Sequence, residues 1–458
     1  MDELVCISPV DGRVVARRPL AADAEVAHAI ESGRRAQRDW RQVPLPDRCA
    51  VLLRFLAEME RLNPQIVPEL ARQMGRPVRY QGELRSLTER VKAMVAAAPD
   101  ALAPDTMGGE QRMVTRVPAG IVLVLAPWNY PFLTAANTIA PALIAGDAVV
   151  LKHSAQTLLA GERFAEALAA AGLPDGLFAN LVLSHEQCAR LLGSGLVDHA
   201  VFTGSVAGGR AVERASAGSF TTLTLELGGK DPAYVRADAD LAGAVDSLVD
   251  GSFYNSGQSC CGVERIYVHR EVWQPFLDAF VATTRQYRLG DPLDPETTLG
   301  PMATAKGAAQ VRAQIAQAIG AGARAHVEPQ DFPSDLPGSA YLMPQVLTGV
   351  DHAMTVMREE SFGPVVGIMP VADDEEAVRL MNDSDYGLTA SIWTRDLDAA
   401  RRLAPRVEAG TVLANRCDYL DPLLAWTGAK LSGRGASLGR YGYEAVTRPR
   451  SFHFRSAP

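Results

Sequence analysis

The sequence Gly-Ile-Val-Leu-Val-Leu-Ala at residues 120–126 is a continuous apolar run that stops at Pro127. Such a run is typical of a strand buried on both faces of a parallel sheet. Strand-like and helix-like segments then alternate as far as residue 227, with strands expected at 147–152, 178–183, 200–203 and 221–227 and helices at 158–171, 185–192 and 207–215. This alternation predicts a parallel, doubly wound α/β sheet, which binds ligands at the carboxyl ends of its strands.

The flanking segments extend this fold class. Residues 23–98 carry apolar residues at three- and four-residue spacing, which predicts packing helices. Polar and apolar residues alternate at 111–117 and at 447–454, which favours exposed strands suited to contacts between subunits. A second alternating block predicts a second α/β domain, with helices expected at 241–253, 273–286, 308–319, 375–381 and 397–407 and strands at 265–269, 388–394 and 411–414.

Composition narrows the function classes. The 458 residues exceed the roughly 250–300 residues at which one core stops growing, so two or three domains are expected. A net charge of −8 argues against a nucleic-acid surface and favours a small-molecule substrate. The acidic N-terminus, with no apolar run after it, argues against a signal peptide, and the chain has no run long enough to predict a membrane span.

The cysteines and histidines indicate the redox compartment and whether a metal site is expected. Six cysteines without a Cys-x-x-Cys pattern fit reduced thiols in the cytoplasm. Eight histidines without a pair at helical spacing predict no metal site.

Three polar residues stand where such a fold places its chemistry. Cys260 lies in Asn-Ser-Gly-Gln-Ser-Cys-Cys, an irregular polar turn that suits a nucleophile better than a core thiol, and its neighbour Cys261 is expected to point elsewhere as a packing residue. Glu226 ends a predicted strand before two glycines and is a candidate base. Asn129 lies in Pro-Trp-Asn-Tyr-Pro after a buried strand, where rigid placement suits an oxyanion donor.

The turn Phe-Thr-Gly-Ser-Val-Ala-Gly-Gly at 202–209 lies between a predicted strand and helix. Its glycines would let a backbone approach a phosphate at the helix N-terminus. A plain tight turn explains the same residues. The chain has neither a Walker loop nor Gly-x-Gly-x-x-Gly.

Taken in order, these segments resemble the aldehyde dehydrogenase superfamily, of the NAD(P)-dependent, hydrolytic type. The resemblance runs over nearly the whole chain. It rests on Ala-Pro-Trp-Asn-Tyr-Pro at 126–131, Leu-Lys-His-Ser-Ala at 151–155, Phe-Thr-Gly-Ser at 202–205, Leu-Glu-Leu-Gly-Gly-Lys at 225–230, Gly-Gln-Ser-Cys at 257–260, Glu-Glu-Ser-Phe-Gly-Pro at 359–364 and Lys-Leu-Ser-Gly-Arg-Gly at 430–435.

The resemblance implies a Rossmann-like NAD(P)-binding domain at 1–100 and 119–227, a catalytic domain at 228–430, and a small β oligomerisation arm at 101–118 and 440–458, in a homodimer or homotetramer. It implies that Cys260 forms a thiohemiacetal and then a thioester, that Asn129 holds the oxyanion, and that Glu226 activates the deacylating water. Its implied cofactor residues, for NAD or NADP, are Trp128, Lys152, Ala155, Gly204, Ser205, Gly209, Glu360 and Phe362.

Two departures from the family pattern bear on specificity. Ala155 stands where relatives often have a glutamate that repels a 2′-phosphate, so NADP is expected to be tolerated along with NAD. Trp426-Thr427-Gly428-Ala429 replaces a common Pro-Phe-Gly-Gly, which leaves the substrate loop at 416–423 hard to model by analogy. By position, the aldehyde pocket is expected to contain Tyr130, Thr134, Asn137, Tyr254, Ser259 and Asp418, a polar set that favours a small polar or amino-bearing aldehyde.

Three other functions compete with hydrolytic oxidation. A cysteine hydrolase would use the thiol, but the sequence offers it no compelling His partner and it leaves the two-domain βαβ pattern with cofactor-like turns unexplained. In a CoA-acylating aldehyde dehydrogenase, CoA resolves the thioester, and Glu226 weighs against it because no hydrolytic base is then needed. A catalytically silent structural protein with this fold would not need Cys260, Glu226 and Asn129 together.

Overall fold

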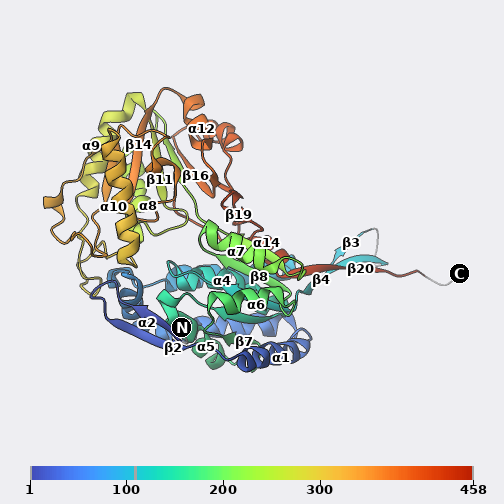
Figure 1. The fold of residues 1–458 in the computed structure, drawn as a ribbon. Helices are drawn as coiled ribbons and strands as arrows, with labels where there is room; N and C mark the ends of the chain where they lie inside the picture. Colours follow the sequence, from blue (N-terminus) through green and yellow to red (C-terminus); the bar gives the residue numbers. More distant parts are fainter. Residues whose placement is uncertain (1–2, 108–110, 456–458) are drawn as a thin grey trace.

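The computed structural model describes residues 3–107 and 111–455, which form two α/β bodies and a projecting arm (Figure 1). The first body is built on a sheet with strand order β19-β9-β8-β5-β6-β7, in which all neighbours except β19 and β9 run parallel. Its strands are β5 (Ile121–Leu125), β6 (Ala148–Lys152), β7 (Phe178–Asn180), β8 (His199–Thr203), β9 (Thr222–Glu226) and β19 (Gly433–Arg434).

The run that opened the sequence analysis forms the centre of this sheet. All five residues of β5 are buried, because β6 pairs with one edge and β8 with the other. The crossover helices are α4 (Pro131–Ala145), α5 (Leu158–Ala170), α6 (His185–Gly193) and α7 (Val206–Ser216), and the N-terminal part adds α1 (Asp23–Trp40), α2 (Leu45–Met74) and α3 (Leu84–Ala101). The predicted doubly wound sheet is therefore confirmed.

The second body has seven strands in the order β12-β13-β14-β11-β10-β16-β17, with only β12 antiparallel. They are β10 (Asp231–Val235), β11 (Val263–His269), β12 (Arg324–Ala325), β13 (Gln345–Thr348), β14 (Val365–Val371), β16 (Thr389–Trp393) and β17 (Thr411–Ala414). The helices are α8 (Leu241–Phe253), α9 (Trp273–Thr284), α10 (Ala305–Gly320), α11 (Thr355–Arg358), α12 (Asp374–Asn382) and α13 (Leu397–Leu403).

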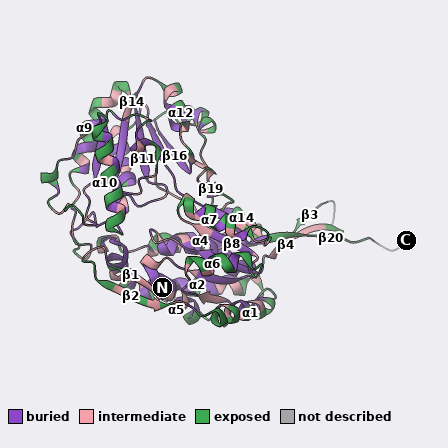
Figure 2. Cartoon of the chain, viewed as in Figure 1, coloured by how far each residue is buried: buried purple, intermediate pink, exposed green. Residues whose placement is uncertain are grey.

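Alternation along the central strands separates two layers of core. Val235, Ile266 and Ile368 pack with α8 and α9 on one face. Tyr234 and Tyr267 pack with α12 and α13 on the other face. Figure 2 shows buried residues along the strands and exposed residues on the outer sides of the helices.

The sequence did not predict β10, β13 or β14. The clearest case is β14, which contains Gly367 and Pro370, two residues that normally argue against a central strand. A glycine is needed at position 367 because the Met357 sulfur occupies the space that any larger side chain would take. A contact with a distant residue therefore explains this glycine within the strand.

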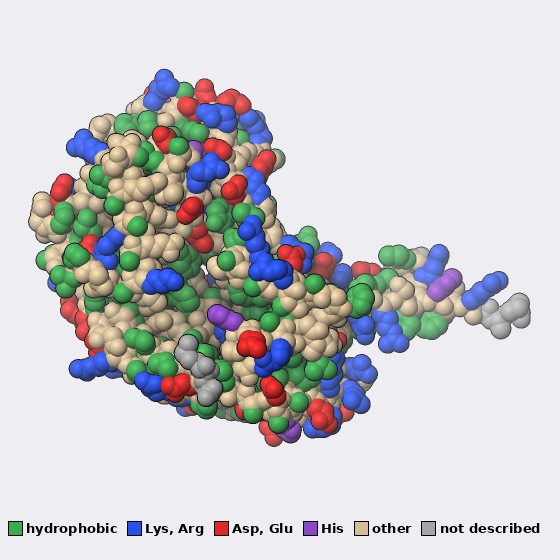
Figure 3. Space-filling model, in the orientation of Figure 1, with side chains coloured by type: hydrophobic (Ala, Val, Ile, Leu, Met, Phe, Trp, Pro, Cys, Tyr) green, Lys and Arg blue, Asp and Glu red, His purple; other side chains and the backbone are tan. Residues whose placement is uncertain are grey.

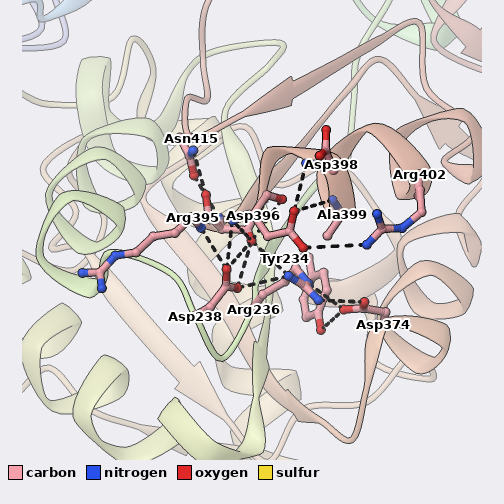
Figure 4. A network of polar contacts seen from close by, with 11 residues as sticks. Tyr234, Arg236, Asp238, Asp374, Arg395, Asp396, Asp398, Ala399, Arg402 and Asn415 are labelled. Atoms are coloured by element: carbon pink, nitrogen blue, oxygen red, sulfur yellow. Dashed lines mark hydrogen bonds and ion pairs between the residues drawn. The ribbon is translucent and has the colours of Figure 1, made fainter.

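The carboxyl edge of the second sheet is filled by a polar network (Figure 4). Arg236 donates to both oxygens of Asp374, at 2.9 and 3.1 Å. Asp238 accepts hydrogen bonds from the Thr394 hydroxyl and from two backbone N–H groups at the start of the next loop. These groups largely satisfy one another. Cys260 lies at the opposite edge, just before β11, and there the second sheet faces the carboxyl edge of the first.

The arm is a three-stranded antiparallel sheet of β20 (Thr447–His453), β4 (Arg112–Pro118) and β3 (Asp105–Thr106). It extends away from both bodies in Figure 1. The chain reaches it through α14 (Gly439–Ala445). Two short sheets complete the fold, one of β1 (Glu3–Ile7) and β2 (Val14–Pro19), the other of β15 (Tyr386–Gly387) and β18 (Ala429–Lys430).

Charged side chains of both signs are interspersed over the face drawn in Figure 3. Within residues 3–107 and 111–455, no helix combines the length and apolar character needed to cross a membrane. The same residues hold no group of three or more His, Cys, Asp or Glu side chains arranged to bind a metal.

Candidate active site

Two cavities meet at Cys260 between the two bodies. One encloses about 270 Å³ and the other about 280 Å³, and both are lined by Cys260, Glu226, Thr203 and Leu227. The first is also lined by residues of α3, α4 and the loop at 416–423, and we call it the aldehyde-side cavity. The second is lined by the turns after β5, β8 and β9, and we call it the cofactor-side cavity.

The backbone before Cys260 is strained. Asn255 and Ser256 have left-handed φ angles of 53° and 58°, and Gly257 follows at 68°. Two consecutive non-glycine residues in this region require support from the surroundings. The Asn255 amide donates to the carbonyl oxygens of Asn129 (3.1 Å) and Gln258 (3.2 Å), and the Ser256 hydroxyl donates to the Gly300 carbonyl at 2.8 Å. The half-buried Cys260 thiol is thereby presented on a fixed turn.

Glu226 lies at the carboxyl end of β9, where the sequence predicted it, and it is buried. Burial raises the pKa of its carboxyl group, although two hydroxyl donors oppose the shift. The Ser437 hydroxyl donates to one oxygen at 2.5 Å and the Thr203 hydroxyl donates to the other at 3.0 Å.

Asn129 follows β5 and projects toward the Cys260 turn. Its side-chain amide donates to the Gln258 carbonyl at 3.2 Å. Arg76 donates to the Asn129 carbonyl at 2.5 Å and to the Asn255 side chain at 3.3 Å, so one guanidinium holds both loops.

Glu83 completes this arrangement. It forms a buried ion pair with Arg76, and its second oxygen accepts the backbone N–H groups of Phe132 (3.1 Å) and Leu133 (2.8 Å) at the start of α4. The sequence analysis missed this pair. Nothing in the local pattern between α2 and α3 marks it, because its partners lie about 50 to 180 residues away.

All six residues expected in the aldehyde pocket line the aldehyde-side cavity, namely Tyr130, Thr134, Asn137, Tyr254, Ser259 and Asp418. Asp418 accepts hydrogen bonds from Ser259 (2.7 Å) and from the Cys261 thiol (3.0 Å), and burial raises its pKa to about 6. Cys261 is buried in the hydrophobic core, as expected of a packing residue, and it also forms part of the wall of the aldehyde-side cavity.

Two further charged residues of this wall were not predicted. Asp250 of α8 lines the cavity, burial raises its pKa, and it makes no ion pair with any described residue. Arg90 of α3 is buried and donates to the Asn137 side chain at 3.1 Å. Both residues were missed because each fits the helical periodicity of its segment, and nothing in that pattern indicates that the side chain lines a cavity.

Five of the predicted cofactor residues line the cofactor-side cavity, namely Trp128, Gly204, Ser205, Glu360 and Phe362. The Trp128 and Phe362 rings meet edge to face, with centroids 5.5 Å apart. Ser205 is the N-cap of α7 and accepts the Gly208 N–H at 3.2 Å. A side chain at Gly204 would collide with the Phe202 ring, so that ring would have to shift if Gly204 were replaced.

Glu264 of β11 holds the loop that carries Glu360. Glu264 accepts the backbone N–H groups of Ser361 and Phe362 and forms a buried ion pair with Lys230. The Glu360 carboxylate accepts the Gly229 N–H at 3.2 Å, and burial raises its pKa to about 8.

The other three predicted cofactor residues lie outside the lining of this cavity. Gly209 is buried, and a side chain there would collide with Leu227, so it brings α7 against β9. Lys152 ends β6, and burial lowers its pKa. Ala155 begins the 3₁₀ turn Ala155–Thr157 just beyond.

The model of the aldehyde dehydrogenase family matches residues 2–452. The chain belongs to this family. Betaine aldehyde dehydrogenase 2 of Rhizobium meliloti (strain 1021) is 35% identical over 457 residues, with 98% of this chain and 93% of the relative covered. Succinate-semialdehyde dehydrogenase [NADP(+)] 1 of Mycobacterium tuberculosis is 33% identical over 96% of this chain and 97% of the relative.

Solved structures of other aldehyde dehydrogenases share the fold. Succinic semialdehyde dehydrogenase from Streptococcus pyogenes, in complex with NADP+, superposes with a TM-score of 0.94 at 26% identity over 99% of this chain and 100% of that one. Lactaldehyde dehydrogenase from Escherichia coli gives 0.93 at 28% identity over 99% and 96%. The predicted family and the predicted pair of α/β domains are confirmed.

Proposed function

We propose that this aldehyde dehydrogenase oxidises an aldehyde to a carboxylic acid with NAD(P) through a covalent intermediate on Cys260, and that water releases the product. The observation that carries the proposal is the position of the Cys260 thiol where the two cavities meet, with Glu226 on the wall of both. A nucleophile at such a junction can hold one reactant while facing the other.

In the first step Cys260 reacts as the thiolate, after its proton has passed to water, and the sulfur adds to the aldehyde carbon while the carbonyl oxygen becomes an oxyanion. The Asn129 amide and the Cys260 backbone N–H are the donors assigned to it. Asn129 can leave the Gln258 carbonyl at little cost, because the Asn255 amide also donates to that carbonyl at 3.2 Å. The strained turn and Arg76 keep the two donors in register.

NAD(P), held by the residues of the cofactor-side cavity, would supply the acceptor for the hydride, two electrons and one proton, that the tetrahedral carbon on Cys260 loses as the thioester forms. Glu226 then takes a proton from water, the resulting hydroxide adds to the thioester carbon, and the Cys260 sulfur leaves as the acid forms. A base buried enough to have a raised pKa suits proton abstraction near neutral pH.

The residues of the cofactor-side cavity fit a dinucleotide. Ser205 caps the start of α7, where the first N–H groups of a helix have no intrahelical acceptor and can face a phosphate. Trp128, Glu360 and Phe362 surround the end nearest Cys260. The Lys152 ammonium makes no hydrogen bond or ion pair with the described residues, and Ala155 carries no charge, so we propose that NADP is accepted along with NAD. A 2′-phosphate penalty of about a hundredfold or more in kcat/KM would contradict this.

The aldehyde-side cavity favours a small polar aldehyde that bears an amino group. Asp418 and Asp250 make no ion pair with the described residues. Among the cations of this wall, Arg76 is paired with Glu83, and the field of Arg90 is shared between Asp418 and Glu226. The rings of Tyr130 and Tyr254 supply aromatic surface, which suits an ammonium group.

One assay tests the whole proposal. Purified protein is given aminoaldehydes, short aliphatic aldehydes and semialdehyde acids, each with NAD and with NADP, and both nicotinamide reduction and free acid are measured. We expect turnover without CoA and the highest kcat/KM for an aminoaldehyde. Strict dependence on CoA would contradict water as the acceptor, and a preference for long aliphatic chains would contradict the assigned substrate.

We also propose that the arm joins copies of this chain into a homodimer or homotetramer. It projects from the body, and the Phe452 ring of its outer strand stacks on the ring of Phe454 just beyond the strand, a residue that is 57% exposed. Light scattering should give two or four times the monomer mass, and removal of residues 447–458 should yield monomers.

A further inference from the structure

Ser437 is a polar residue that the reaction has not yet used, although it touches the assigned base. It is 4% exposed and lies in the C-terminal segment, more than 200 residues from Glu226 along the chain. Its hydroxyl donates to one Glu226 oxygen at 2.5 Å, a distance typical of a strong bond from a hydroxyl to a carboxylate. Ser437 is absent from the lining of both cavities, so it reaches the reaction only through Glu226.

We propose that Ser437 is a positioning residue for the deacylation step, which holds the Glu226 carboxylate in the orientation that lets it take a proton from water. This inference rests on the proposed role of Glu226.

The backbone around Ser437 is held firmly enough for this role. Its N–H and C=O both pair with Trp426, at 2.9 and 2.8 Å. Leu438 follows with a left-handed φ of 63°, and α14 begins directly after it. The Tyr443 hydroxyl of α14 donates to the Met94 carbonyl at 2.7 Å, which anchors the helix on α3. The hydroxyl of Ser437 is therefore presented from a rigid segment.

The second Glu226 oxygen is held from another direction. Thr203, at the end of β8, donates to it at 3.0 Å, and this residue belongs to the turn that lines the cofactor-side cavity. One donor on each oxygen fixes the plane of the carboxylate. Each oxygen has two acceptor sites, so one site per oxygen remains for a water molecule. Ser437 is the donor that can be removed without changing a cavity wall.

Three titratable or charged groups lie around Glu226. The positive charge of Arg90 on α3 lowers the pKa of Glu226. The Cys260 thiol lines both cavities together with Glu226, and Glu360 lines the cofactor-side cavity. Burial raises the pKa of Glu226, and the two hydroxyl donors lower it. Loss of the Ser437 hydroxyl should therefore move this pKa further upward. The acid limb of the deacylation rate should move to higher pH, because the carboxylate then becomes protonated at a higher pH.

The test follows the acyl-enzyme directly by intact mass after a single turnover with the full-length protein and NAD(P). In Ser437→Ala we expect the acyl group to form at the normal rate and to decay about tenfold to a hundredfold more slowly, as for loss of a hydrogen bond to a charged group. Thr427→Val is the control, because it removes another hydroxyl of the same segment, one that bonds the Gly435 carbonyl. It should decay like the wild type.

A matched pair of variants separates the effect of the Ser437 hydroxyl from the effect of side-chain shape. Ser437→Thr keeps the hydroxyl and Ser437→Val replaces it with a methyl group in a side chain of the same form. Decay should be faster in the threonine variant, with its acid limb at lower pH. Equal decay rates and equal pH profiles in the pair would overturn the role of Ser437. Glu226→Gln separates the two levels of the proposal, because normal decay there would overturn the role of Glu226 itself.

Discussion

The two cavities that meet at Cys260 are built in different ways. On the cofactor side much of the wall comes from turns directly after strands, with glycines that leave the main chain exposed, and the rest comes from the loop that carries Glu360 and the start of α10. On the aldehyde side it comes from side chains of α3, α4, α8 and the loop at 416–423, and several of these are charged. The first wall is specified by backbone geometry and the second by side-chain chemistry. Substitutions on the aldehyde side should therefore change substrate preference and leave cofactor use intact.

The largest effect is expected where the cavities join. Cys260→Ala removes the nucleophile that both sides share, and we expect oxidation to fall by about 10⁴-fold or more. NAD(P) binding, measured by calorimetry, should persist because the cofactor-side turns are untouched. Cys261→Ala is the matched control, since it removes the neighbouring thiol from the wall but keeps the nucleophile. Comparable loss of activity in both variants would assign the chemistry to the wrong sulfur.

A smaller effect, confined to one side, is expected for Asp418→Asn. Loss of the buried carboxylate should raise KM for an aminoaldehyde by about tenfold to a hundredfold, because an interaction with a charged group contributes about 1.5–3 kcal/mol. KM for NAD(P) and the rates with a neutral short aldehyde should change by no more than about threefold. A uniform loss across all aldehydes would show that Asp418 only supports the turn.

Lowering the pH should raise KM for an aminoaldehyde in the unmodified enzyme, as Asp418→Asn does at neutral pH. The pKa of Asp418 is raised to about 6, so its charge is present above that pH and is lost below it. KM for a cationic aldehyde should rise as the pH falls through about 6, whereas KM for a neutral aldehyde should stay flat over that range. Parallel curves for the two aldehydes would contradict the assignment.

The smallest effect is expected at the far end of the cofactor side. Ala155→Glu places a carboxylate near Lys152 and should lower kcat/KM for NADP about tenfold relative to NAD, through repulsion of the 2′-phosphate. Ala155→Gln has the same size without the charge and should change the ratio little. Aldehyde KM should not move in either variant. A change in the aldehyde KM would mean that the two cavities are coupled.

The contrast between the cavities also explains what the sequence could predict. The strands and turns that carry Glu226, Asn129 and Gly204 are local patterns, because a buried strand followed by a glycine or proline turn shows itself in consecutive residues. Their placement followed from the rule that parallel strands end at one edge of a sheet. The family resemblance added Glu360 and Phe362, which no local pattern marks as a cofactor site.

Only some residues of the aldehyde-side cavity could be predicted from the sequence. Arg76, Glu83, Arg90 and Asp250 lie on helices or short connections whose periodicity is explained by packing alone, and their partners are distant in sequence. Ser437 follows a glycine-rich segment with no regular period, and only the folded chain brings it to Glu226. β14 was missed because a glycine and a proline lie within a strand whose stability comes from its neighbours on both sides.

The central claim, that Cys260 forms the acyl intermediate and Glu226 acts only afterwards, is tested most directly by rapid mixing of Glu226→Gln with an aldehyde and NAD(P). The account predicts a burst of nicotinamide reduction close to one equivalent per active site, an acyl group on Cys260 by mass, and almost no further turnover. Loss of the burst to the same degree as in Cys260→Ala would contradict it, because Glu226 would then be needed before hydride loss.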